Sequence, residues 1–86
     1  MSRFGKLIQG ILSGRHDNSI KFSESVNLLK ALGFSVRIKG SHHIFHREDV
    51  EEIINLQPDG SKTKAYQVKQ IRELIVKYRM EEKDNE

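Results

Sequence analysis

The chain has 86 residues and a mass of 10.0 kDa, which is the size of one small domain. Charged residues make up 31% of the chain. Cysteine is absent, and this excludes disulfide scaffolds, cysteine-ligated zinc and thiolate catalysis. The net charge of +3 is unevenly spread, because the last seven residues hold four acids and one base. The remaining surface is therefore more basic than the total suggests, as is common in proteins that meet phosphate backbones or acidic partners.

No apolar run approaches the roughly 18 residues of a membrane span, and the first residues lack the apolar core of a signal peptide. The absence of cysteine fits a reducing compartment. We therefore expect a cytoplasmic protein with no membrane partner.

Helical periodicity marks the first part of the chain. Five apolar residues recur at helical spacing and lie on one stripe: Phe4, Leu7, Ile8, Ile11 and Leu12. They predict a short first helix that ends at Ser13 and Gly14. We expect its apolar stripe to pack into the core; the alternative is that the stripe is a docking face for a partner. A loop is expected over residues 15–21. A second amphipathic helix follows, with Ser23 as its predicted cap and Gly33 as its stop.

From residue 34 onward the apolar period changes to two, which is typical of strands. Residues 34–39 predict a first strand, and residues 39–41 predict a hairpin turn. Two further strands are expected, over residues 42–46 and 51–57, so short links join three strands into an antiparallel meander. The sequence Pro-Asp-Gly at residues 58–60 ends it.

A final helix is predicted over residues 65–79, and residues 80–86 are expected to form a frayed acidic tail. The order is then helix, helix, three strands, helix. One sheet face covered by helices satisfies this order, so we predict an α+β two-layer domain whose other sheet face is free for a partner.

A cluster of histidines carries the catalytic potential of the chain. Three of them fall within five residues: His42, His43 and His46. Histidine accepts and donates protons near neutral pH, and the nearby Arg37 and Lys39 can bring phosphate within reach. Cleavage of RNA needs a base for the 2′-hydroxyl, an acid for the leaving 5′-oxygen and positive charge for the phosphate. Gly40 in the turn would let a nucleic-acid backbone approach closely.

Two other interpretations of the histidines stay open. On a strand, His42 and His46 share one face and His43 points to the other, so a metal site lacks an evident third ligand. Glu48 and Asp49 could join only through a sharp bend, and we assign no metal. The histidines can also be ordinary polar strand residues. A one-residue slip in register would reverse the face that carries His42.

Four stretches resemble the HicA (YcfA-like) mRNA interferase toxins: residues 28–34 (LLKALGF), 36–45 (VRIKGSHHIF), 54–58 (INLQP) and 66–75 (YQVKQIRELI). They contain, in order, a Leu-Gly-Phe helix end, a Lys-Gly-Ser-His turn and a basic closing helix. The resemblance covers roughly residues 23–79. Each motif is weak by itself, and their order and spacing make the combination specific.

The resemblance implies a fold like a double-stranded-RNA-binding domain, α-β-β-β-α, to which this chain adds an N-terminal helix. It also implies an endoribonuclease that cleaves mRNA without a metal or other cofactor, with His42 as the catalytic histidine. Such toxins are held inactive by a HicB-type antitoxin in a hetero-oligomer, and they meet DNA only indirectly through that antitoxin. Many relatives have a second histidine after the proline, where this chain has Pro58-Asp59.

These expectations assign roles to individual residues. His42 acts as general base or acid, Gly40 and Ser41 shape the turn and offer phosphate donors, and His43 is a possible accessory group. The expected RNA contacts are basic: Arg37, Lys39, Lys62, Lys64, Lys69 and Arg72. The chain divides into an extension (1–22), the HicA-like catalytic domain (23–79) and the tail (80–86). A non-catalytic RNA-binding or protein-interaction module on the same fold is the alternative.

Overall fold

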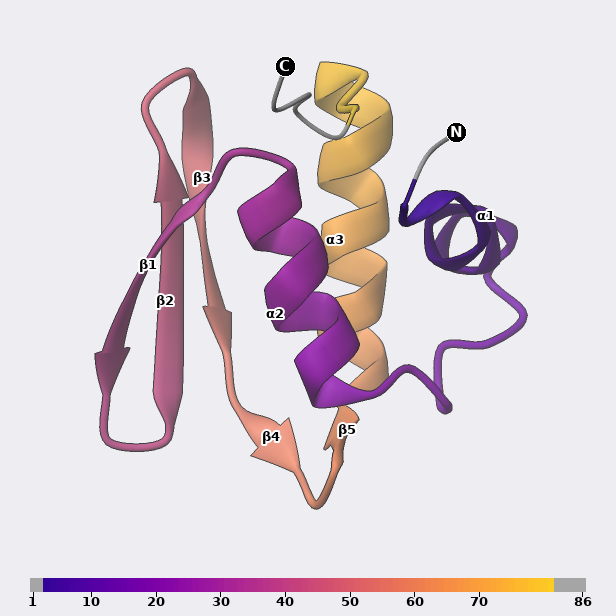
Figure 1. Ribbon diagram of the computed structural model, residues 1–86, viewed down its shortest axis with the longest axis horizontal. Coiled ribbons are helices and arrows are strands. Elements are labelled where there is room, and N and C mark those ends of the chain that lie inside the picture. Colours follow the sequence, from indigo (N-terminus) through magenta and orange to yellow (C-terminus); the bar gives the residue numbers. More distant parts are fainter. Residues whose placement is uncertain (1–2, 82–86) are drawn as a thin grey trace.

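A computed structural model describes residues 3–81 of the protein. They form a three-stranded antiparallel sheet with helices on one of its faces. The helices are α1 (Gly5–Ser13), α2 (Phe22–Ala31) and α3 (Ala65–Tyr78). The strands are β1 (Ser35–Lys39), β2 (His42–Arg47), β3 (Val50–Leu56), β4 (Pro58–Asp59) and β5 (Lys62–Thr63). Helices α2 and α3 lie beside the sheet, and α1 packs against α3 on the side away from it (Figure 1). The predicted α+β fold and its added first helix are confirmed.

The core lies between the sheet and the two helices. Strand β2 sits in the middle of the sheet, and its Phe45 is completely buried opposite Ile54 of β3. The same cluster of buried side chains includes Leu28 and Leu29 of α2 and residues of α3 and the N-terminal segment. Because strand side chains alternate between faces, burial of Phe45 under the helices turns its neighbours in β2 outward.

The start of α2 differs from the prediction. The helix begins at Phe22, so Lys21 is its N-cap and Ser23 is an exposed residue of the first turn. The backbone N–H of Lys21 donates to Oε1 of Glu24 at 3.0 Å. A glutamate in the first turn therefore satisfies the N-terminal end of this helix, in place of the serine hydroxyl that the sequence suggested.

The predicted break after the third strand forms a small hairpin. Strands β4 and β5 pair Pro58 with Thr63 around a turn in which Gly60 has a positive φ of 62°. The hairpin also pairs with the chain before α2: Thr63 N donates to Ile20 O at 2.9 Å, and Phe22 N donates to Ser61 O at 2.9 Å. The first turns of α2 and α3 are thereby fixed next to each other, at the lower end of the molecule in Figure 1.

The expectation that fraying begins at residue 80 is wrong for Met80. Arg79 takes the left-handed conformation that ends α3, and the N–H of Met80 donates to Ile75 O at 3.0 Å. This turn folds the Met80 side chain back onto the core, where 8% of it is exposed. Glu81, the next residue of the predicted tail, is exposed, and residues 82–86 lie outside the described residues.

Polar contacts fasten the last turn of α3 to β3. Lys77 Nζ donates to Glu52 Oε2 at 2.7 Å, and the Tyr78 hydroxyl donates to Glu52 Oε1 at 2.6 Å. These two hydrogen bonds, first that of Lys77 and then that of Tyr78, lower the pKa of Glu52 to about 2. The same carboxylate raises the pKa of Lys77. Glu52 is therefore ionised throughout the neutral range and joins strand to helix.

The N-terminal segment belongs to the same core as the rest of the chain. Ile11 of α1 is 1% exposed and Ile20 is 5% exposed, and Leu7 and Ile8 pack against this cluster. The prediction that the apolar stripe of the first helix adds to the core is confirmed. Leu12, the last residue of the stripe, is 43% exposed.

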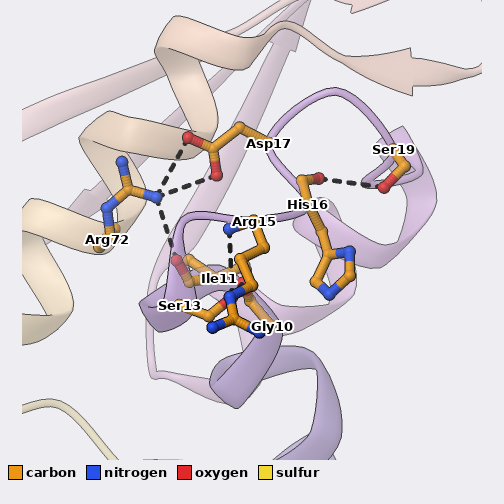
Figure 2. Close-up of polar contacts among 8 residues, drawn as sticks. All are labelled: Gly10, Ile11, Ser13, Arg15, His16, Asp17, Ser19 and Arg72. Atoms are coloured by element: carbon orange, nitrogen blue, oxygen red, sulfur yellow. Dashed lines mark hydrogen bonds and ion pairs between the residues drawn. The ribbon is translucent and has the colours of Figure 1, made fainter.

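An arginine of α3 holds this segment in place (Figure 2). Arg72 Nη1 donates to both carboxylate oxygens of Asp17, at 2.9 and 3.2 Å, and to the backbone oxygen of Ile11 at 3.1 Å. About a fifth of each charged side chain is exposed, at 21% and 22%. Gly14 ends α1 with a positive φ of 74°, and a Cβ there would lie 3.5 Å from Arg72 Nη1. The guanidinium therefore bridges the end of α1 and the following loop.

Replacing Asp17 with alanine should lower the free energy of unfolding by about 1–3 kcal/mol, because it leaves a largely buried guanidinium with only a carbonyl partner. Urea denaturation of the variant and the wild type measures the difference. Glu73→Ala is the matched control, since Glu73 is exposed on the same helix and its loss should cost little. Equal destabilisation by the two substitutions would contradict the role given to the ion pair.

Candidate functional site

The turn between β1 and β2 has the geometry of a close-approach site. Gly40 has a positive φ of 61°, and a Cβ built on it would meet nothing within 4 Å. The requirement for glycine is therefore conformational, because a side chain would have free space but an unfavourable backbone. Ser41 follows as an exposed residue, and the turn projects beyond the sheet at the lower end of the molecule (Figure 1).

His42 is the first residue of β2 and lies on the face of the sheet away from the helices. Its neighbours establish the direction: Phe45 is buried under the helices, and the His43 ring contacts Phe22 of α2. Alternation then places His42, Ile44 and His46 on the opposite side. We call this side the open face, and its residues on the three strands include Arg37, Lys39, His42, Ile44, His46 and Asn55.

Two amide side chains from the β3 segment contact the turn and its histidine. His42 Nδ1 lies 3.1 Å from Asn55 Oδ1. Gln57 Nε2 donates to Ser41 Oγ at 3.3 Å. Because Ser41 Oγ accepts this hydrogen bond, its own O–H remains able to donate to an incoming phosphate oxygen. His42 keeps Nε2 directed away from Asn55, and the residue is exposed.

His43 and His46 occupy different surroundings from His42. His43 points toward the helices, with its ring 5.0 Å from that of Phe22 at an interplanar angle of 82°. Its Nδ1 is buried and finds no hydrogen-bond partner among residues 3–81. His43, expected as an accessory group, thus faces away from His42. His46 shares the open face and pairs with Ser35 at the other end of the strand.

Basic side chains lie next to His42 on β1, and others gather at the same end of the molecule. On β1, Lys39 pairs directly with His42 and Arg37 pairs with Ile44, and both basic residues are exposed. At the same end of the molecule, Lys62 pairs with Lys21 in an isolated antiparallel bridge, and Lys64 is the N-cap of α3. The amino ends of two helices add partial positive charge there, so the lower end is suited to an anionic ligand.

Two of the predicted RNA contacts lie apart from this group. Arg72 is engaged by Asp17 and Ile11 on the α1 side of α3. Lys69 is exposed on α3, which belongs to the helix layer behind the sheet. The structure pairs Lys39 with His42 and Arg37 with Ile44, whereas Lys69 and Arg72 lie on α3 in the helix layer.

Three residues of the site are absent from the sequence-based expectations: Lys21, Asn55 and Gln57. Asn55 of β3 and Gln57 just after it are two residues apart and therefore lie on the same face. That this is the open face follows only from the register with β2, which the sequence does not show. Lys21 lies at the end of a loop that has no hydrophobic periodicity. Its place beside the other lysines follows only from its backbone pairing with Lys62.

The described part of the chain also bears on metal binding and on membranes. Within residues 3–81, no group of three or more histidine, aspartate or glutamate side chains is placed to hold a metal ion. Across the same residues, no helix combines the length and apolar character that crossing a bilayer requires.

Comparison with known families places the chain. A family model described as the HicA toxin of bacterial toxin-antitoxin systems matches residues 22–76. The chain belongs to the HicA toxin family. No curated protein and no solved structure matches it.

The HicA match covers the structure from the first residue of α2 into the last turns of α3. It therefore includes the whole sheet, the turn at Gly40 and His42, and it omits α1 and its loop. Membership identifies the protein as the toxin of a toxin-antitoxin module, whose partner is an antitoxin. The earlier resemblance to this family is confirmed.

Replacing Gly40 with alanine should lower the free energy of unfolding by about 1 kcal/mol, because only the left-handed backbone resists the new side chain. Gly10→Ala is the matched control within α1, where a Cβ would make an ordinary 3.5 Å contact with His16. That substitution should stabilise the protein by about 0.5–1 kcal/mol through helix propensity. Thermal or urea unfolding measures both, and a stabilising Gly40→Ala would refute the strain argument.

Proposed function

We propose that this HicA toxin is a metal-independent endoribonuclease that cleaves mRNA in the cytoplasm with His42 as its catalytic residue. The observation that carries the proposal is the environment of His42: an exposed imidazole on the open face, next to a glycine turn and directly across from Lys39. An mRNA-cleaving activity is also what membership in the family suggests.

The chemistry requires movement of one proton at each end of the scissile phosphodiester. His42 Nε2 removes the proton of a ribose 2′-hydroxyl, whose oxygen attacks the neighbouring phosphorus while the 5′-oxygen leaves. The leaving oxygen takes a proton from water or from the imidazolium that the first transfer forms. Lys39 and the Ser41 hydroxyl are placed to stabilise the charge on the phosphate oxygens during attack.

The RNA strand is proposed to run from the open face across the lower end of the molecule. Its phosphates would meet Arg37 and Lys39 first, and then Lys62 and Lys64, with Lys21 added by its pairing with Lys62. Lys69 and Arg72 are left out of this path because they project from the helix layer. Gly40 permits the backbone of the RNA to come close to the turn.

A HicB-type antitoxin is the proposed partner, bound in a hetero-oligomer over the open face. That face carries the site and is extended by Ile53 of β3, which is 61% exposed. A partner that covers it would block the approach of RNA to His42. Contact with DNA would come only through this antitoxin. In this proposal residues 23–79 form the catalytic domain, and residues 1–22 support it.

Replacing His42 with alanine should reduce RNA cleavage by about 10²- to 10⁴-fold, because no other described group on the open face is placed to exchange protons at the same point. The assay uses a long single-stranded mRNA with EDTA present, and circular dichroism confirms that the variant is folded. His16→Ala is the matched control, since His16 is exposed beside α1. It should cleave like the wild type.

Other results of this assay would decide against the proposal. Cleavage that EDTA abolishes would indicate a metal-dependent enzyme. Equal cleavage by the wild type and His42→Ala would remove His42 from catalysis. RNA binding without cleavage by either protein would favour the alternative of a non-catalytic binding module on the same fold.

Neutralising Lys62 and Lys64 together as glutamines should weaken RNA binding and reduce its salt dependence. Each lost phosphate contact removes about 0.7 from the slope of log affinity against log salt concentration for a single strand, so the pair should remove about 1.4. Lys6→Gln with Lys30→Gln is a control of equal charge change on exposed residues of α1 and α2. Equal slopes for the two double variants would move the RNA path elsewhere.

A further inference from the structure

We infer that Asn55 is a positioning residue that selects the tautomer of His42 and so directs its basic nitrogen toward the RNA. The inference deepens the proposed function and rests on it for its catalytic meaning. It concerns a residue outside the turn motif, on the neighbouring strand, thirteen positions along the chain from His42.

The placement of the amide oxygen toward the ring gives the hydrogen bond between the two side chains its direction. Asn55 Oδ1 is an amide oxygen, which only accepts, and it lies 3.1 Å from His42 Nδ1. The proton of a neutral His42 is therefore on Nδ1, and the lone pair is on Nε2. Nε2 is the nitrogen farther from the strand, so this tautomer presents the base toward solvent and substrate.

The backbone of Asn55 is fixed by a neighbouring strand and by α3. Asn55 pairs with Ile44 of β2, and its backbone oxygen accepts a hydrogen bond from Gln67 Nε2 at 3.1 Å. Gln67 is 2% exposed, lies in the first turns of α3, and its Oε1 has no partner among the described residues. The chain of contacts thus runs from α3 through Asn55 to His42.

An asparagine suits this role better than an aspartate would. A carboxylate at the same place would also accept a hydrogen bond from Nδ1. Its negative charge would stabilise the protonated imidazole, which has no free lone pair to act as a base. The charged and titratable groups facing His42 are Lys39 across the hairpin, with Arg37 and His46 farther along the open face. Within residues 3–81 no helix packs on this side, so these strand residues and the amides of Asn55 and Gln57 form the polar surroundings of the ring.

The test compares the wild type with Asn55→Ala, Asn55→Asp and the control Asn27→Ala, whose asparagine is exposed on α2. Long-range ¹H–¹⁵N NMR spectra of the imidazole rings identify the tautomer of His42. The signals of His42 are assigned as those that disappear in His42→Ala. Dispersion of the backbone amide signals shows that each variant is folded. The rate of mRNA cleavage is measured for each protein as a function of pH.

In the wild type and in Asn27→Ala, the neutral ring should carry its proton on Nδ1. Asn55→Ala should shift the ring toward the Nε2–H form and slow cleavage by about 3- to 10-fold, the range expected for loss of one hydrogen bond. Asn55→Asp should keep the Nδ1–H form, and the rise of the rate with pH should occur at higher pH. A residue with a merely structural role would change neither the tautomer nor the pH profile.

An Nε2–H tautomer in the wild type, or a tautomer that Asn55→Ala leaves unchanged, would overturn the inference. Failure of the proposed function looks different: the wild type would not cleave RNA, or His42→Ala would cleave equally well. In that case the spectra still decide whether Asn55 sets the tautomer of His42.

Discussion

The burial of Phe45 in the central strand is the constraint on which the site depends. This ring fills the space between the sheet and the helices, and strand geometry then assigns every other residue of β2 to a face. His43 is turned toward Phe22, and His42 is turned outward beside Lys39. A shift of one residue would bury His42 and expose Phe45, so the apolar core fixes the position of the polar chemistry.

The chemical group and the charges around it come from segments far apart in the sequence. The start of β2 supplies His42. Asn55 of β3 and Gln57 just after it contact His42 and Ser41, and the β4–β5 hairpin brings lysines to the same end of the molecule. Both packed helices begin there, so their backbone dipoles reinforce the side-chain charges. One end of a small domain thereby combines a proton acceptor, phosphate donors and a positive field.

Local patterns predict the three helices, the three-stranded meander and the turn at Gly40, but not the N-cap of α2 or the pairing of β4 with β5. Alternation predicted three strands, the stop at Gly33 and the helical stripes were readable, and Gly40 marked the hairpin. Long-range contacts were not readable, because they depend on register and packing. Arg72 looked like one more basic residue of a charged helix until its contact with Asp17, 55 positions away, was known. Asn55 and its hydrogen bond to His42 were hidden for the same reason.

The family match and the folding unit have different boundaries in this chain. The match begins at Phe22, yet Ile11 and Ile20 are part of the buried cluster and Arg72 finds its acceptors in the preceding segment. A fragment cut to the matched region would retain His42 and its neighbours on the open face, but it would lose Lys21 and would expose an apolar side of α3 and a guanidinium without a carboxylate. Domain dissection guided by sequence similarity alone would thus yield a protein that keeps its histidine but is poorly soluble.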